Sequence, residues 1–359
     1  MKSRSLVLGI LALGAFGLTA CSDQTTTEPA QPAGPSPTAP ELAVVSNSWI
    51  TRENMWGTDR YDLAATTVTN AAGQSILYAI GGRTGINAGT ALGKVMAYNT
   101  ATDTWITKAS LPTPLWGTNG AAVLNGKIYI SGGCAEIGQA TCVFDPPSSA
   151  LFVYDPNTNT WTRKHDMPSV LSSSGTSQFG GTHGATGVIA GRLYVLTECY
   201  EAFEPAFDHC SPALFFRYNP VIDKWTVLPR PVGGHDFAVG GVIDGKFYAT
   251  GFDGQLEVYD PATNHWTTKA PLPNPHVRLS TGGVAQGRLF IIGGQRLTDP
   301  ETPLRRTIAY DPTNNTWITK APMPTARVGV AASRVFVNGQ ARIEVVGGVR
   351  PGNNLQYIP

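Results

Sequence analysis

The stretch YDPNTNTW, residues 154–161, recurs along the chain and organises the whole sequence. Its relatives are YNTATDTW (98–105), YNPVIDKW (218–225), YDPATNHW (259–266) and YDPTNNTW (310–317). Asp-Pro-x-x-Asn favours a tight turn, because Pro fixes its own φ and Asn tolerates the left-handed conformation. A repeat of roughly 50 residues is typical of repeat architectures and overrides the expectation of two ordinary domains. Each copy therefore predicts the last turn of one repeated unit.

A second pattern lies upstream of each Tyr/Trp element, clearest in GAAVLNGKIYISGG, residues 120–133. Relatives occur at 187–196, 240–251 and 282–294, with divergent forms at 66–82 and 331–348. Each is a short apolar strand, a tight turn and an alternating strand that ends in glycine. The third copy departs from the pattern, since Thr197 and Glu198 replace the double glycine; in the fourth, Phe252 follows Gly251. With the strands that flank the YDPNTNTW turn, each unit predicts four antiparallel strands.

These units resemble the kelch repeat from about Val44 to Pro359, which implies an all-β fold, a six-bladed kelch-type β-propeller. The chain ends in NNLQYIP (353–359), while the matching SNSW stands at 46–49. The sixth copy is thus split between the two ends of the domain. Because an open ring would expose strand edges, we expect the N-terminal strand around Trp49 to complete the C-terminal blade and close the ring.

The N-terminus has the features of an export signal. Lys2 and Arg4 precede an apolar run over 6–18, which is short for a membrane span. The run ends in LTAC (18–21), which resembles the lipobox of bacterial lipoproteins and implies lipidation of Cys21. We therefore expect a signal peptide over 1–20, a Pro/Thr-rich tether over 21–42 and a propeller over 43–359. The implied location is the cell envelope, anchored by lipid; Ser22 favours the outer membrane if the cell has one.

Cys21 is one of five cysteines, and the other four would lie in an exported domain where oxidation is expected. Four cysteines allow three pairings. Cys134 with Cys142 and Cys199 with Cys210 each bracket one loop after the second strand of a unit. We therefore expect these two local disulfides.

The function is expected on the face that carries the irregular loops, because the opposite face consists of repeated tight turns. The inter-blade loops lead into the innermost strands, so their last residues should ring the mouth of the central channel. The predicted ligand-binding residues are Trp116, Asn119, His183, His235, Asp236, His276, Arg278 and Arg327, with Tyr61 and Asp62 nearby. Such side chains suit a sugar, a carboxylate or a peptide. The competing interpretation for each one is a structural partner of the backbone or of an adjacent blade.

Two further groups of residues leave alternatives open. His183, His235 and His276 open three successive blades and are candidates for a metal, although their spacing does not require one, and we predict neither metal nor cofactor. The loop between Cys199 and Cys210, with its near edge, carries Glu198, Glu201, Glu204, Asp208 and His209. They suit an acid/base pair or a calcium site, but we favour a solvated acidic loop pinned by a disulfide.

A formal net charge of +1 argues against nucleic acid as a partner, and no common catalytic motif is present. We expect a monomeric binding module for a carbohydrate or a protein. The alternative is a carbohydrate-active enzyme similar to the six-bladed sialic acid mutarotases of the bacterial envelope, or of epimerase type; a copper enzyme similar to galactose oxidase is a more distant one. An enzyme should show a carboxylate beside a His or Arg with a shifted pKa in a deep pocket at the channel mouth.

Overall fold

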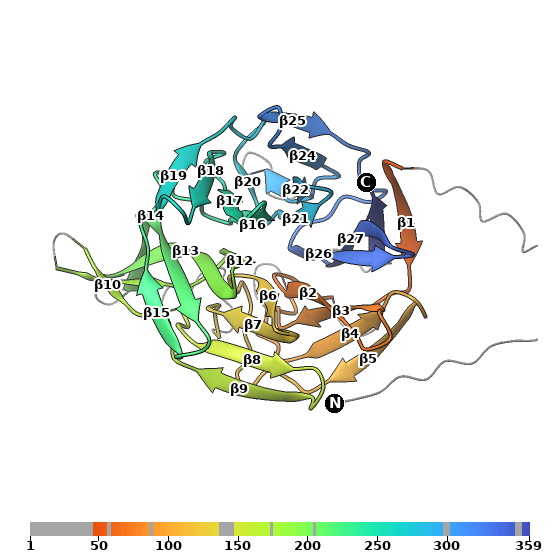
Figure 1. The fold of residues 1–359 in the computed structure, drawn as a ribbon, viewed down its shortest axis with the longest axis horizontal. Coiled ribbons are helices and arrows are strands. Elements are labelled where there is room, and N and C mark those ends of the chain that lie inside the picture. Colours follow the sequence, from red (N-terminus) through yellow and green to blue (C-terminus); the bar gives the residue numbers. More distant parts are fainter. Residues whose placement is uncertain are drawn as a thin grey trace, which may run out of the picture. The chain divides into compact units, whose positions relative to one another are not determined.

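The computed structural model describes residues 46–55, 59–85, 89–135, 147–172, 175–203, 206–296, 302–348 and 354–359, with the backbone alone for 201–203 and 206–211. Within these ranges every regular element is a β-strand, so the all-β prediction is confirmed. Six antiparallel sheets stand around a common axis as the blades of a propeller (Figure 1). No helix in the described ranges is long and apolar enough to cross a membrane.

Each blade is a four-stranded meander whose first strand lies at the axis and whose fourth lies at the rim (Figure 1). Blade 1 has β2 (Ala64–Thr69), β3 (Ser75–Ile80), β4 (Val95–Asn99) and β5 (Thr104–Lys108). Blade 2 has β6 (Ala121–Leu124), β7 (Lys127–Ser131), β8 (Leu151–Asp155) and β9 (Thr160–Lys164). Blade 3 has β12 (Ala185–Ile189), β13 (Arg192–Phe203), β14 (Ala206–Asn219) and β15 (Lys224–Val227).

The remaining blades follow the same plan. Blade 4 has β16 (Val239–Ile243), β17 (Lys246–Thr250), β18 (Leu256–Asp260) and β19 (His265–Thr268). Blade 5 has β21 (Thr281–Ala285), β22 (Arg288–Ile292), β24 (Thr307–Asp311) and β25 (Thr316–Thr319). Blade 6 has β26 (Val330–Val337), β27 (Gln340–Gly347), β28 (Asn354–Ile358) and β1 (Ser48–Arg52). Blade 6 therefore takes its outer strand from the start of the domain.

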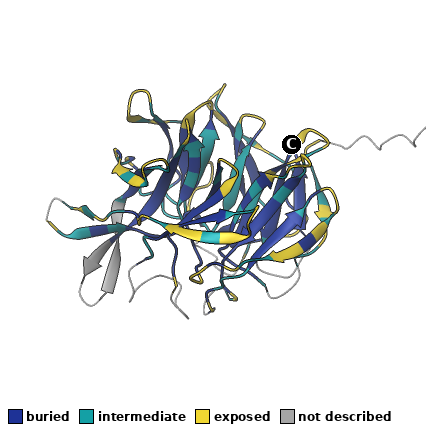
Figure 2. Ribbon diagram, turned by 60° about the horizontal axis from the view of Figure 1, so that its bottom comes forward, coloured by how far each residue is buried: buried dark blue, intermediate teal, exposed yellow. Residues whose placement is uncertain are grey.

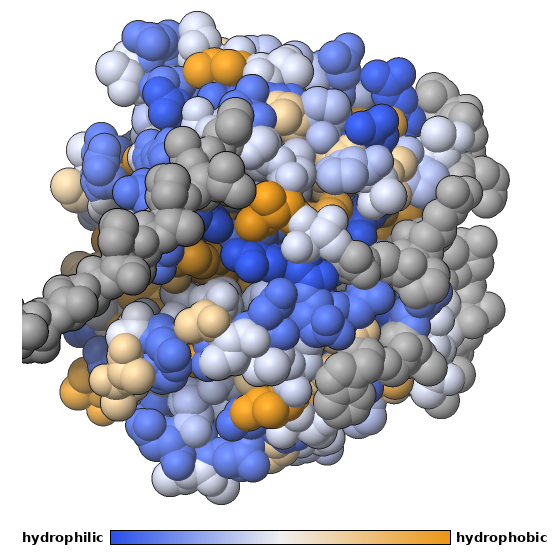
Figure 3. Space-filling view, turned by 90° about the vertical axis from the view of Figure 1, so that its right-hand side faces the viewer, coloured by the Kyte–Doolittle hydropathy of each residue, from blue (hydrophilic) through white to orange (hydrophobic). Residues whose placement is uncertain are grey.

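The split sixth copy of the repeat is confirmed. β1 pairs antiparallel with β28, so that Trp49 lies opposite Tyr357. Their ring centroids are 5.0 Å apart, as in the Tyr98–Trp105 and Tyr154–Trp161 pairs of intact copies. On the side near β1 the surface is mostly polar, with small separate apolar groups (Figure 3). The N-terminal strand thus closes the ring, and it removes the edge that β28 would otherwise expose.

The recurring spacing of Tyr, Asn or Asp, and Trp builds a joint between neighbouring blades. In blade 2, the Tyr154 hydroxyl donates to Asn159 Oδ1 (2.6 Å), and Trp161 Nε1 donates to the carbonyl of Ala109 at the end of blade 1 (2.9 Å). The Ala109 N–H donates back to Asn159 Oδ1 (2.9 Å). The same Trp bond recurs around the ring, from Trp49, Trp105, Trp225, Trp266 and Trp317. The motif therefore recurs because each copy fastens one blade to the one before it.

The core consists of separate apolar clusters between neighbouring blades rather than one central mass. Tyr78 and Ile80 of blade 1, for example, pack with Ile128 and Tyr154 of blade 2. Side chains alternate along each strand, so one blade presents one set of residues to each of its two neighbours. Figure 2 shows the resulting pattern, in which strand interiors are buried and turns exposed.

The double glycines end the second strands of the blades that have them. Gly82, for instance, has φ of +95°, and a Cβ there would lie 2.7 Å from the carbonyl oxygen of Tyr61. Blade 3 departs from this pattern because β13 and β14 continue as a long hairpin. β10 (Val170–Leu171) and β11 (Ser177–Gly180) add to the same sheet. The segment expected to be an irregular loop is therefore an extension of the blade, and it starts at a β-bulge between Thr197 and Cys199.

Candidate functional site at the channel mouth

One residue from each blade forms a ring at the channel entrance, just ahead of the innermost strand. All six have left-handed φ values, and they are Asp62 (51°), Gly117 (56°), His183 (43°), Phe237 (53°), Leu279 (55°) and Gly329 (65°). Backbone hydrogen bonds link several neighbours; the N–H of Gly117 donates to the Asp62 carbonyl (2.8 Å), and that of His183 to the Gly117 carbonyl (2.7 Å). The ring fixes the backbone of the mouth.

A cavity of about 340 Å³ runs from this ring into the channel. Its walls are the inner strands, where small residues predominate, such as Ala64, Ala121, Gly184, Gly240 and Gly282. The polar side chains at its mouth include Asp62, Thr118 and His183. The cavity is at the lower end of the roughly 300–1,000 Å³ typical of small-molecule sites.

His183 is the central side chain of the mouth. Its ring lies 4.8 Å from that of Phe237 and 5.7 Å from that of Trp116, measured between centroids. Both ring nitrogens are buried and form no hydrogen bond with the protein. A Cβ at Gly117 would approach His183 Nε2 to 2.8 Å, so glycine at 117 makes room for the imidazole.

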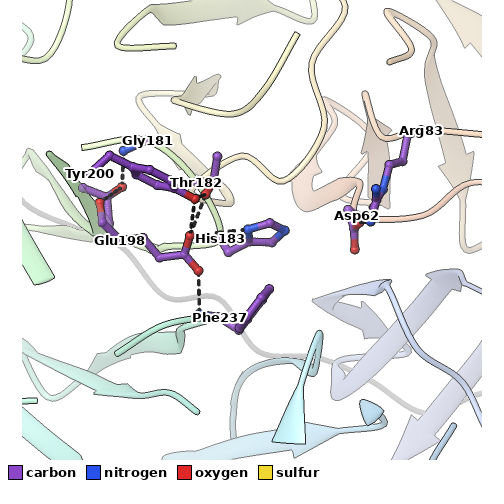
Figure 4. Close-up of polar contacts among 9 residues, drawn as sticks. Asp62, Arg83, Gly181, Thr182, His183, Glu198, Tyr200 and Phe237 are labelled. Carbon is purple, nitrogen blue, oxygen red and sulfur yellow. Dashed lines mark hydrogen bonds and ion pairs between the residues drawn. The ribbon is translucent and has the colours of Figure 1, made fainter. Parts of the chain in front are cut away.

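Glu198 is the bulge residue of β13 and is fully buried. Its Oε2 accepts hydrogen bonds from Thr182 Oγ1 (2.6 Å) and the Tyr200 hydroxyl (2.9 Å), and its Oε1 accepts from the N–H of Phe237 (2.9 Å). Oε2 is 3.6 Å from His183 Nδ1. Because a bulge re-aims a side chain, the departure from double glycine turns this carboxylate toward the mouth (Figure 4).

The surrounding charges raise the pKa of His183 above its usual value. Burial alone would lower this pKa, but Glu198 and, to a lesser extent, Asp62 favour the imidazolium and outweigh it. Burial and Glu198 also raise the pKa of the Tyr200 hydroxyl, which keeps it a hydrogen-bond donor. The pair of Glu198 and His183 is therefore a fixed acceptor beside a group that can carry a proton near neutral pH.

Asp62 belongs to a second fixed group on the other side of His183 (Figure 4). Arg83 Nη2 lies 2.7 Å from Asp62 Oδ2, and both side chains are buried. The Arg83 guanidinium carbon is 4.2 Å from the centroid of the Trp116 ring, a cation–π contact. Asp62 thus offers the mouth a carboxylate whose position is set by Arg83.

Among the described residues, His183 alone of the predicted ligand-binding set lines the cavity. His235 is completely buried, with Nε2 2.8 Å from Glu257 Oε2, which also accepts from the N–H of Gly233 (2.8 Å). Arg327 is buried as well, and it donates to Thr325 and to the Gly347 carbonyl. These contacts fit the competing interpretation of His235 and Arg327 as structural partners. Ligand binding by either stays a prediction.

The other predicted residues surround the mouth without lining the cavity. Trp116 packs behind Arg83 and His183, and Asn119 is fully buried at the end of the inter-blade loop. Asp236 is partly buried, and the exposed His276 packs against Phe252. Arg278 is partly buried in the short strand β20 (Val277–Arg278), which pairs with β23 (Gln295–Arg296) in blade 5.

The sequence analysis did not identify Arg83, Thr182 and Phe237, and it considered Glu198 only as part of the loop between Cys199 and Cys210. The signal for Glu198 was present, since it replaces a glycine of the repeat. The expectation of a solvated loop is wrong for Glu198, which the bulge buries. Glu204 and the side chains of Glu201, Asp208 and His209 lie outside the described residues, so the calcium alternative stays open there.

No group of three or more His, Cys, Asp and Glu suited to a metal ion occurs in the part of the chain that the structure describes. Cys199 lies opposite Cys210 in the backbone register of β13 and β14, as a local bridge requires. Cys142 lies outside the described ranges. The two disulfide pairings therefore stay predictions. The signal peptide, the tether and Cys21 also fall outside these ranges.

The chain is similar to known kelch proteins over much of the propeller. Kelch motifs match at residues 66–112, 118–168 and 278–324. The Kelch-like protein terF of Aspergillus terreus is 27% identical over 198 residues, which cover 51% of this chain and 40% of that protein. Kelch-like protein 25 of Xenopus tropicalis is 25% identical over 247 residues, 65% of this chain and 38% of that protein. The chain thus spans less than half the length of these relatives.

A solved structure has the same fold. It is described as the structure of YjhT, and it matches 84% of this chain and 93% of its own length with a TM-score of 0.58 and 15% identity. At that identity the likeness concerns the fold alone. The chain therefore carries kelch motifs in blades 1, 2 and 5 and has the fold of a six-bladed β-propeller.

Proposed function

We propose that this propeller binds a small polyhydroxylated ligand, a carbohydrate of monosaccharide size, at the channel mouth. The observation that carries the proposal is His183, which lines the 340 Å³ cavity. Its Nε2 is buried without a hydrogen-bond partner in the protein, while its Nδ1 faces Glu198 Oε2 at 3.6 Å. A buried polar group without a partner is costly, so a ligand that supplies an acceptor gains affinity there.

The neighbours of His183 support a sugar rather than an apolar ligand. The Asp62 carboxylate accepts hydrogen bonds, and the Thr118 hydroxyl, which has no partner in the protein, donates or accepts. The Phe237 ring offers an apolar face to the C–H groups of a sugar. A cavity of this size encloses one sugar ring, whereas a protein partner needs a much broader contact area.

Variants of two histidines test the proposal. A panel of neutral monosaccharides is first screened by calorimetry to find one that binds the wild type. We expect His183→Gln to weaken binding of that sugar at least about tenfold. The matched control is His265→Gln, because His265 is exposed at the start of β19, beside the tight turn on the opposite face. Equal affinity of wild type and His183→Gln for every sugar that binds would place the site elsewhere.

Binding should also depend on pH. The raised pKa of His183 means that the imidazolium, which donates from both nitrogens, persists above the usual pKa of histidine. Affinity that relies on this donor should fall as the pH rises through the pKa of His183. The same titration of His183→Gln should be flat over this pH range.

An acid–base enzyme acting on sugars is the second candidate, favoured by the 3.6 Å approach of Glu198 to His183 and by the raised pKa. In mutarotation the bond between the anomeric carbon and the ring oxygen breaks. Protonated His183 would give its proton to the ring oxygen, while a mouth carboxylate accepts the proton of the anomeric hydroxyl. Polarimetry on fresh sugar solutions tests this. An interconversion rate that is the same for wild type and His183→Gln rejects the enzyme but not the binding module.

We propose further that the protein is held in the cell envelope by a lipid on Cys21, with 21–42 as the tether. Support comes from the basic start, the apolar run and LTAC. A Cys21→Ser variant should leave the membrane fraction or fail to mature. An unchanged mass of the mature N-terminal peptide would contradict the anchor.

A further inference from the structure

Three arginines of blade 5 lack acidic partners on the same face as the mouth. By contrast, the buried Arg83 and the partly exposed Arg288 each lie 2.7 Å from an aspartate oxygen. No carboxylate of the described residues lies within ion-pair distance of Arg278, Arg296 or Arg306. The described residues do not include 297–301. Blade 5 thus brings positive charge to the loops beside the cavity.

The geometry leaves the donors of these arginines unused. Arg306, just before β24, makes only long bonds to the Asn274 carbonyl (3.3 Å) and to Ser280 Oγ (3.4 Å), and its buried Nε has no partner. Arg278 lies opposite Gln295 in the β20–β23 ladder, and its buried Nε also lacks a partner. Guanidinium groups held in this way are ready to donate to an added acceptor.

Arg296 and Arg306 lie close enough to repel each other. Burial and then the charge of Arg296 lower the pKa of Arg306 to about 10, so it stays charged at neutral pH. The buried carboxylates nearest the mouth lie on other blades, with Asp62 on blade 1 and Glu198 on blade 3, and Glu257 of blade 4 is paired with His235. An anion bound on blade 5 would reduce the repulsion between Arg296 and Arg306, which no carboxylate of the described residues offsets.

Ser280 connects this group to the proposed sugar site, because it lines the cavity and accepts from Arg306. We infer that Arg278, Arg296 and Arg306 form an anion subsite beside the cavity, and that the ligand is an acidic sugar whose carboxylate, sulfate or phosphate binds there. The planar guanidinium fork matches the two oxygens of such a group. The acidic-sugar part rests on the proposed function, whereas the anion subsite does not.

Inorganic sulfate tests the subsite without a sugar. In calorimetric titrations at low salt we expect Arg306→Gln and Arg296→Gln each to weaken sulfate binding at least about fivefold. Arg296 is exposed, so its variant keeps the test valid if Arg306→Gln folds poorly. The control is Arg163→Gln, whose exposed arginine pairs with Asp166 on the rim of blade 2. Sulfate affinity that is absent, or equal in all four proteins, overturns the subsite. Acetate and phosphate in the same titration separate a carboxylate from a phosphate site.

A matched pair of sugars separates the two proposals. Wild type should bind glucuronate at least about fivefold more tightly than glucose, and Arg306→Gln should remove this preference. If both sugars depend on His183 but bind equally, the subsite fails and the sugar site stands. If sulfate depends on Arg306 while neither sugar binds, the proposed function fails and the subsite stands.

Discussion

Five of the six interfaces between blades carry an aromatic contact at the same position. At the sixth interface, between blades 6 and 1, where the ring closes, this position holds a carboxylate. At one position of the second strand, a ring packs on the repeat tyrosine of the next blade. The pairs are Tyr78–Tyr154, Tyr129–Tyr218, Tyr194–Tyr259, Tyr248–Tyr310 and Phe290–Tyr357, with centroids 5.6 to 6.2 Å apart. In blade 6 the same position is Glu344. Its neighbours Ile343 and Val345 face blade 5, so alternation turns Glu344 toward blade 1.

Glu344 belongs to a buried polar network at the closure. Gln356 Nε2 donates to Glu344 Oε2 (2.7 Å), and Gln356 Oε1 accepts from Arg342 (2.7 Å) and from Arg52 of β1 (3.1 Å). Burial raises the pKa of Glu344 to about 8. The comparison teaches that consecutive blades are joined by apolar packing, whereas the closure adds polar contacts that reach the incoming strand. Such contacts favour one register of β1, because a slipped strand leaves buried polar groups unpaired.

The largest effect should come from removing the closing strand. Deletion of residues 43–52 takes away Trp49, which packs on Tyr357 and donates to the Ala321 carbonyl, and it exposes the edge of β28. We expect aggregation, or a Tm at least about 10 °C lower by calorimetry, since the deletion removes a whole strand pairing together with the partly buried Trp49. Deletion of 22–42 is the control and should leave Tm unchanged. A normal Tm without β1 would contradict closure by this strand.

A carboxylate in an apolar interface should cost nearly as much. Tyr248→Glu copies the closure residue into blade 4, where no polar network accepts it, and removes the contact with Tyr310. We expect a loss of about 3–5 kcal/mol in the free energy of unfolding, measured with urea. Tyr248→Phe is the control, because Phe290 fills this position in blade 5. A small loss for Tyr248→Glu would show that the interfaces are interchangeable.

Glu344 should make stability depend on pH. Its pKa is raised from 4.5 to about 8 in the folded protein. The unfolded chain therefore releases this proton first, and stability is lost as the pH rises from about 4.5 to about 8. Glu344→Gln should be more stable than wild type by roughly 2 kcal/mol or more at pH 9, and close to it at pH 4.5. Parallel pH profiles of the two proteins would show that Glu344 is ionised when buried.

The smallest effect compares two joints. Asn159 and Asn264 each accept a hydrogen bond from the tyrosine of their own repeat, and both have φ near 57°. Replacing either asparagine with alanine therefore carries the same cost for the left-handed backbone, and this cost drops out when the two variants are compared. Asn159 also accepts from the N–H of Ala109, but the matching residue for Asn264 is Pro229, which has no N–H. Asn159→Ala should therefore cost about 1 kcal/mol more in urea unfolding than Asn264→Ala. Equal losses would mean that the inter-blade bond contributes nothing measurable.

The candidate site was predictable only in outline. The face and the ring of inter-blade residues followed from the topology, and His183 was named on that basis. Arg83 and Glu198 were not placed there, because they reach the mouth from the segment after β3 and from the bulge of β13 rather than from the inter-blade loops. His235 shows the opposite error. It lies two residues before Phe237, the ring residue of blade 4, and its ring is buried against Glu257.

The sequence by itself determined the number of blades, the positions of the turns and the split sixth copy. These features rest on local chemistry, such as left-handed asparagines, glycine pairs and alternating strands, which repeats at a fixed spacing. Only the tertiary structure decided which polar side chains are satisfied inside a blade and which face the channel. That choice depends on partners brought together across blades, as Asp62, His183 and Glu198 are from blades 1 and 3, and no local pattern records those distances.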